Sequence, residues 1–181
     1  MKRSLLLFTL AGLLLACKEV SFPEPQPKGI ASVAEIPPAL RGQYLARESD
    51  GSGGDTIVVE PWGYHLRDKN ENDWLGQGRL SDSLVVKVHQ NYFFVNFRAN
   101  DQWVLRVIQR LPNGDLNFMM LDVQNDEVRK SLLKKLSKFG PVKEVKHDDD
   151  TFYQINPSPA QLMQMIKEGY FKKETLERIG N

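Results

Sequence analysis

The chain has 181 residues and carries 24 basic and 23 acidic side chains, which gives a formal charge of +1. Hydrophobic residues make up 41%, charged residues make up 26%, and there is one cysteine. The length fits a single domain, and the composition argues against a disordered chain, a disulfide scaffold and a polybasic nucleic-acid binder. We therefore expect a globular protein with no nucleic-acid partner.

The N-terminus has the layout of a secretory signal. Lys2 and Arg3 precede an apolar run over residues 5–16, which is short for a membrane span. The run ends in Leu14-Leu15-Ala16-Cys17, which resembles the lipobox of bacterial lipoproteins. The resemblance implies cleavage before Cys17 and acylation of this residue, palmitate included. The alternatives are a plain cleaved signal that leaves a free cysteine, and a buried N-terminal helix.

The same resemblance predicts a location and a domain plan. A lipoprotein of this kind is anchored in the bacterial cell envelope through its lipid, and we expect the outer membrane. Lys18-Glu19 resembles a surface-export signal of some lipoproteins, with the start of a polar linker as the alternative. Alternating prolines at 23, 25 and 27 favour extended polyproline II. We therefore predict a signal peptide (1–16), an acylated cysteine with a Pro-rich tether (17–30) and one β-rich domain with a helical C-terminal part (31–181).

Short strands separated by turn residues follow from residue 42. Apolar residues alternate with polar ones, as in half-buried strands. The pattern predicts strands at 43–47, 56–60, 64–67, 84–88, 93–97, 103–107 and 116–120, with an irregular one at 74–80. Asn113-Gly114 is the best hairpin signal, because this pair accepts positive φ.

The C-terminal part carries the helical signals. Asn125 or Asp126 caps a helix whose apolar residues recur every three or four positions, at Val128, Leu132 and Leu136. Strands are predicted at 142–145 and 152–155. A capping box at 158–161 opens a second helix, and we predict a last short helix that carries residues 176 and 179.

This order of elements predicts an α+β, β-rich fold: an antiparallel meander with the C-terminal helices packed on it. The meander forms either a curved sheet or a barrel. The order, with Gly42-Gln43-Tyr44 after a short turn, resembles the lipocalin-like barrels, whose opening motif is Gly-x-Trp. We expect one face of the strands to be buried under the first helix. The expected core residues are Phe93, Val95, Phe97, Leu105, Val107, Phe118, Val128, Leu132 and Leu136.

The motifs of common enzymes and metal sites are not found in this sequence. There is no paired-His helix, no phosphate-binding glycine loop and no nucleophile elbow. His147 to Asp150 is an oxygen-rich cluster for a hard cation, or simply a charged loop. Asp68, Asn70 and Asn72 begin like a calcium loop, but the later positions depart from the pattern. We predict no catalytic residue, no metal and no cofactor.

Two further patterns concern the surface. The first helix carries basic residues that either face anionic head groups or form a solvated face: Arg129, Lys130, Lys134, Lys135 and Lys138. Thr56 and Ser83 each follow an aspartate and precede an apolar residue, which resembles a bacterial O-glycosylation sequon. Both are also ordinary entries into strands.

The function that we predict is a non-catalytic binding module, anchored to the membrane, for a small apolar ligand or an envelope protein. A barrel mouth is a usual place for such a ligand. The aromatic side chains expected to face it, with core packing as the alternative, are Trp62, Tyr64, Trp74, Phe94 and Trp103. The other hypotheses are a structural or assembly protein that docks a partner through its C-terminal helices, and a hydrolase that uses Asp and His.

Overall fold

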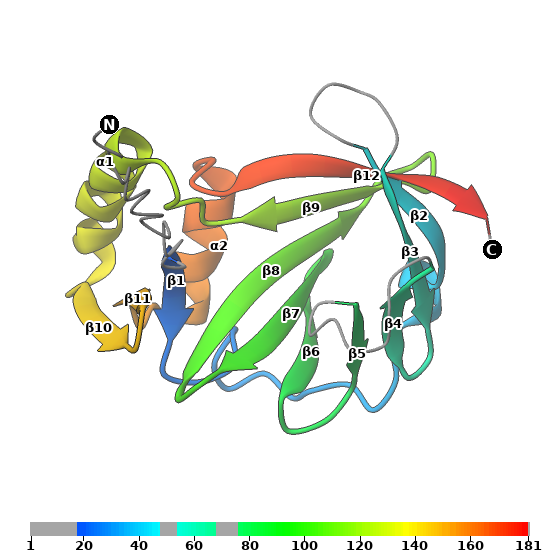
Figure 1. The fold of residues 1–181 in the computed structure, drawn as a ribbon, viewed down its shortest axis with the longest axis horizontal. Coiled ribbons are helices and arrows are strands. Elements are labelled where there is room, and N and C mark those ends of the chain that lie inside the picture. Colours follow the sequence, from blue (N-terminus) through cyan, green and yellow to red (C-terminus); the bar gives the residue numbers. More distant parts are fainter. Residues whose placement is uncertain (1–17, 48–53, 68–75, 181) are drawn as a thin grey trace, which may run out of the picture.

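The computed structural model describes residues 18–47, 54–67 and 76–180, and they form one large sheet with helices packed on part of it (Figure 1). The helices are α1 (Asp126–Leu136) and α2 (Pro159–Lys167), with short 3-10 turns η1 (Pro38–Leu40) and η2 (Ser137–Phe139). The strands are β1 (Lys18–Phe22), β2 (Gly42–Ala46), β3 (Asp55–Glu60), β4 (Gly63–Leu66), β5 (Gln77–Arg79), β6 (Leu84–His89), β7 (Tyr92–Ala99), β8 (Gln102–Arg110), β9 (Leu116–Met120), β10 (Lys143–His147), β11 (Asp150–Gln154) and β12 (Lys172–Gly180).

Strand β8 is the centre of the sheet. One edge pairs with β7, in the register Phe94 to Val107. The other edge pairs first with β1, in the register Phe22 to Trp103, and then with β9, in the register Val107 to Met119. The sheet therefore splits here: β1 leads to β11 and β10, whereas β9 leads through β12 to β2, β3, β4 and β5. Figure 1 shows these two branches at opposite ends of the molecule.

The branch from β9 to β5 curls back towards β6 and β7 without closing. In the described part of the chain, the curled strands begin with β6 and end with β5, and no backbone pairing joins β5 to β6. Tyr64 of β4 meets Phe97 of β7 edge-on across the gap, with 6.3 Å between ring centroids. The Val33 amide donates to Val86 of β6, and the Ile36 amide donates to Pro61. The predicted β-rich α+β fold with a curved antiparallel sheet is confirmed, in the form of an open sheet.

The sheet buries both of its faces around β7, β8 and β9. The concave side holds one hydrophobic core with contributions from both ends of the curl: Ile36, Leu40, Tyr44, Val86, Ile108, Leu116 and Leu176. The opposite side packs against the helices and β1 in a second, larger core, which includes Phe22, Phe94, Leu105, Val107, Met119, Leu132, Leu136, Leu162 and Met165. Side chains from two layers therefore cover a sheet that is apolar on both faces.

The prediction of a single buried face is wrong. Leu105 and Val107 lie in the core under the helices, whereas Phe93, Val95 and Phe118 pack against the core on the concave side. Successive residues of a strand point to opposite faces of the sheet. Both the odd-numbered and the even-numbered positions of β7 and β8 carry apolar side chains, so both faces of these strands are apolar. Phe94, whose side chain is fully buried, belongs to the helix-side core. A double-sided pattern of this kind is typical of a strand covered on both faces.

The prediction of a Pro-rich tether at residues 17–30 is also wrong for the described residues 18–28. Lys18–Phe22 form β1, which is parallel to β11 and antiparallel to β8. Val20 and Phe22 are 2% and 0% exposed in the helix-side core. Two apolar side chains at alternate positions are enough to bury one face of a five-residue strand. The N-terminal segment is thus an integral part of the sheet rather than a spacer.

The Pro-rich segment, residues 23–28, continues across the sheet and is held by buried polar side chains. The Asn96 side chain accepts a hydrogen bond from the backbone N–H of Gln26 at 2.7 Å and donates one to the backbone carbonyl of Gln26 at 2.9 Å. The Lys87 ammonium donates to the carbonyls of Pro25 and Pro27 at 2.7 and 3.0 Å. Gln26 is fully buried. These bonds replace the water that an extended proline-rich chain would otherwise bind.

The helices begin as the sequence predicts, but the C-terminus differs. Asn125 caps α1 by accepting from two backbone amides, and Ser158 with Gln161 forms the capping box of α2. The predicted last helix is wrong, because residues 172–180 form β12 between β9 and β2. The three-residue spacing of Leu176 and Ile179 fits a helix, yet only Leu176 is buried. Backbone pairing with two distant strands decides the conformation here.

Candidate functional site

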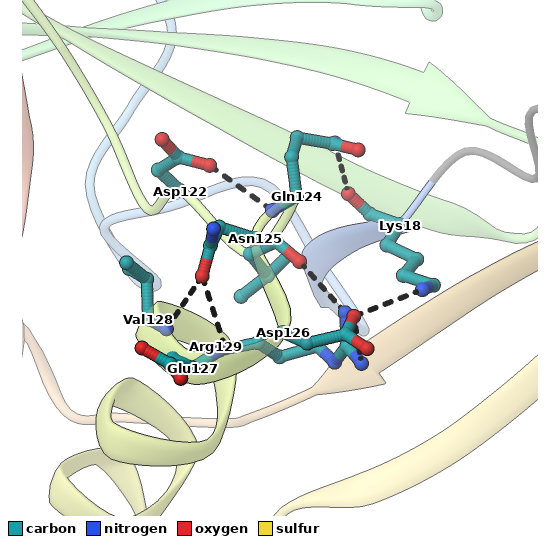
Figure 2. Close-up of polar contacts among 9 residues, drawn as sticks. Lys18, Asp122, Gln124, Asn125, Asp126, Glu127, Val128 and Arg129 are labelled. Carbon is teal, nitrogen blue, oxygen red and sulfur yellow. Dashed lines mark hydrogen bonds and ion pairs between the residues drawn. The ribbon is translucent and has the colours of Figure 1, made fainter.

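The junction between the start of β1 and α1 is tightly bonded (Figure 2). The Lys18 carbonyl accepts from the Gln124 side-chain amide at 2.6 Å. The Lys18 ammonium lies 3.6 Å from the Asp126 carboxylate, in the first turn of α1. The first described residue is therefore fixed against the N-terminal end of a helix that lies more than a hundred residues further along the chain.

Asp126 is the electrostatic centre of this junction. The Arg129 guanidinium, 2.7 Å away, holds the pKa of the Asp126 carboxyl below its ordinary value by its hydrogen bond and its charge, and Lys18 lowers it further. Arg129 also donates to the Val123 carbonyl at 3.3 Å. The carboxylate is largely exposed. Its interactions therefore orient the junction more than they stabilise the fold.

A groove with a volume of about 680 Å³ runs along α1. We call it the α1 groove. One wall is the side of α1, and the other is the connection from α2 into β12, at 169–172. Its lining residues are Asp122, Glu127, Val128, Ser131, Leu132, Lys135, Gly169, Tyr170, Phe171 and Lys172. Most of its lining is apolar, and its size falls in the range of small-molecule sites, roughly 300–1,000 Å³.

The two lysines of the α1 groove differ in their environment. Lys172 lies 3.0 Å from Glu174 and 3.7 Å from Asp122, and these carboxylates raise the pKa of its ammonium. Lys135 lies over the Tyr170 ring, 5.8 Å from its centroid, and no carboxylate of the described residues is within ion-pair distance of it. Lys135 is therefore the cation of this groove that remains available to an anion.

Val128 departs from its predicted place in the core. The helical period puts it in line with Leu132 and Leu136, which are buried, yet Val128 is 49% exposed. Figure 1 shows α1 at the end of the molecule, where its first turn extends past the neighbouring strands. An apolar residue at a core position of the helix thus forms part of the open wall of the α1 groove.

The aromatic side chains predicted to face a ligand, where the structure describes them, lie in separate places. Phe94 is fully buried in the helix-side core, in agreement with the alternative of core packing. Trp103 is partly buried against the same core. Tyr64 is turned towards Phe97 across the gap of the curl, and burial raises the pKa of its hydroxyl. Trp74 lies outside the described residues.

Trp62 occupies a separate place on the surface of β4 and β5. Its ring is stacked with His65, with centroids 6.0 Å apart, and the Arg79 guanidinium lies 4.6 Å from its centroid. These neighbours cover part of the indole surface. None of the four predicted aromatic residues that the structure describes lines the α1 groove, whose aromatic wall consists of Tyr170 and Phe171.

The other predicted sites have separate outcomes. The His147 imidazole lies 3.2 Å from the Asp148 carboxylate, and no group of three metal-ligating side chains occurs within the described ranges. The sites at 17 and 68–72 lie outside those ranges, so lipidation of Cys17 stays a prediction. Thr56 lies in β3 and Ser83 is exposed before β6, and nothing here tests their glycosylation.

A second, smaller groove of about 420 Å³ lies between the β6–β7 turn and α2, and its lining is more polar. Sequence reasoning missed both grooves. The helical period of α1 predicts a buried Val128. The opposite wall of the α1 groove comes from the α2–β12 connection, and nothing in the sequence places this connection beside α1.

The described chain contains no helix that is both long and apolar enough to cross a membrane. Comparison with protein-family models, curated proteins and solved structures finds no match to this chain.

Proposed function

We propose that this chain is a lipid-anchored protein of the bacterial cell envelope, acylated on Cys17, whose domain is a non-catalytic binding module. The observation that carries the proposal is the sequence Leu14-Leu15-Ala16-Cys17 at the end of an apolar run, directly before the first strand of the sheet. The proposed location is the outer membrane.

The anchor in this proposal is short. Lys18 is bonded to Gln124 and Asp126, and consecutive Cα atoms are about 3.8 Å apart. An acylated Cys17 therefore lies one residue from the folded domain. The domain then rests on the bilayer surface, with the N-terminal end of α1 close to the head groups. A spacer of a dozen residues would instead let the domain move over tens of ångströms.

A binding role is favoured over catalysis by the composition of the grooves. Neither of the two grooves described above is lined by a histidine, and His65 is stacked on Trp62. The ionisable groups of the α1 groove include the cation–carboxylate pair of Lys172 and Asp122, which leaves neither group free to act as a base on a substrate. Its open apolar wall instead suits a ligand with an apolar part.

Metabolic labelling with radioactive palmitate tests the anchor. We expect the full-length wild type to take up label, and the variant Cys17→Ser to take up none. Cys17 is the single cysteine of the chain, so no other thiol can be acylated. Equal labelling of the two proteins, or no labelling of the wild type, would contradict the proposal. The mass of the mature N-terminus gives an independent measurement of cleavage before residue 17.

A further inference from the structure

We propose that the α1 groove binds an acyl chain of a membrane phospholipid, with the lipid phosphate on Lys135. The inference deepens the proposed function, on which it rests, because the lipid anchor would bring this groove to the bilayer. Three features of the described residues carry it: an exposed apolar wall, a cation without a carboxylate partner, and the closeness of the groove to the start of β1.

The apolar wall is the first feature. Among the residues that the structure describes, Val128 is one of three large hydrophobic side chains that are exposed, with Val88 and Ile179. It alone of these lines the α1 groove, beside Leu132 and Phe171. Because Val128 stands at a core position of α1, an apolar group placed against it would complete the buried stripe of the helix.

The charge of the groove is the second feature. Lys172 is already neutralised by Asp122 and Glu174, whereas Lys135 lies over the Tyr170 ring and pairs with no carboxylate of the described chain. A phosphate on Lys135 would form a charge-assisted contact at the rim of an apolar surface. An amphiphile with an anionic head and an apolar tail has this arrangement of groups. Glu127, near the other end of the groove, is exposed, and its carboxylate would remain in solvent, away from the phosphate.

Position is the third feature. Asp126 contacts Lys18, and the next two residues of α1 line the groove. Figure 2 shows Lys18 and Val128 on either side of the helix start. The groove begins one residue beyond the contact that fixes Lys18, so a lipid on the residue before Lys18 would hold this end of the groove near the bilayer. Lipids of the same leaflet are then the apolar ligand with the highest local concentration.

The size of the groove favours a lipid over a protein. Ten residues line it, whereas a standard protein interface uses roughly 20–30 residues on each side. A single acyl chain needs only a narrow apolar surface. Docking of an envelope protein is therefore the competing outcome that the experiment must separate.

Photocrosslinking in the intact membrane distinguishes a bound lipid from a docked protein. The full-length chain carries the photoreactive residue benzoylphenylalanine in place of Val128, and a control chain carries it in place of Ile179, which is 47% exposed but outside the groove. Unchanged circular dichroism checks the fold of both. We expect mass spectrometry to find a phospholipid adduct on the first chain at a yield at least fivefold above the second. Equal yields, no adduct, or a shift to the mass of a protein complex would each overturn the assignment.

The charge of Lys135 provides a second measurement. Lys135→Glu should lower the adduct yield at position 128 about fivefold or more, the effect of roughly 1 kcal/mol per basic residue at an anionic surface. Lys143→Glu, an exposed lysine on β10, is the matched control and should change the yield little. An equal loss in both variants would contradict a contact made by Lys135. If the wild type takes up palmitate but gives no phospholipid adduct, the proposal of lipid binding in the α1 groove is overturned and the proposed anchor is not. If an adduct forms without palmitate uptake, the proposed acylation of Cys17 is contradicted and lipid binding in the groove is not.

Discussion

Truncation of Phe22 separates an integral first strand from a flexible tether. Its side chain is fully buried in the helix-side core and lies opposite Trp103 across the β1–β8 pair. Phe22→Ala should therefore lower the free energy of unfolding by about 3–5 kcal/mol, which combines the lost burial with the cavity left behind. This is a large part of a typical total of roughly 5–15 kcal/mol. A residue in a solvated tether would cost less than about 0.5 kcal/mol.

Urea denaturation followed by tryptophan fluorescence measures this cost. With a slope of about 2 kcal/mol per molar urea, the predicted loss shifts the midpoint down by roughly 1.5–2.5 M. Ile179→Ala, at a side chain that is 47% exposed, is the control and should shift the midpoint by less than about 0.3 M. A shift of that small size for Phe22→Ala would refute the placement of β1 in the sheet.

Three further predictions concern the Pro-rich segment and the start of α1. Asn96→Ala leaves the Gln26 amide and carbonyl without partners and should cost about 1–3 kcal/mol; limited proteolysis should cut at residues 23–28 sooner than in the wild type, and equal rates would contradict the contact. Asn125→Ala removes the cap of α1 and should lower stability by about 1 kcal/mol in thermal unfolding, whereas Asn125→Ser should retain most of it. The lowered pKa of Asp126 stabilises the folded state above the ordinary carboxyl pKa, and this contribution is lost as the pH falls through the lowered value. An NMR titration should show the Asp126 pKa rising in Arg129→Gln, and an unchanged value would contradict that pairing.

Local signals in the sequence were sufficient for most of the elements. The strands β6 to β9 alternate clearly, Asn113-Gly114 forms the turn before β9, with Gly114 at a φ of 97°, and the two helix caps lie where side-chain chemistry puts them. These features depend on interactions within a few residues: the alternation of side chains along a strand, the φ that glycine permits, and the bonds from a cap to its own helix. They predict the class of fold and its β-rich order.

Tertiary contacts decided the rest. The sequence of Lys18–Phe22 predicts the start of a linker, because only Val20 and Phe22 indicate a strand. The strands that pair with this segment, β11 and β8, lie far along the chain. The sequence of the C-terminal segment predicts a helix, but backbone pairing with β9 and β2 makes this segment the strand β12. The exposure of Val128 depends on where α1 ends relative to the sheet, and the second wall of its groove comes from residues 169–172. Periodicity shows that a residue belongs to an apolar stripe, but burial depends on which distant segment covers that stripe, and only the packed chain determines this.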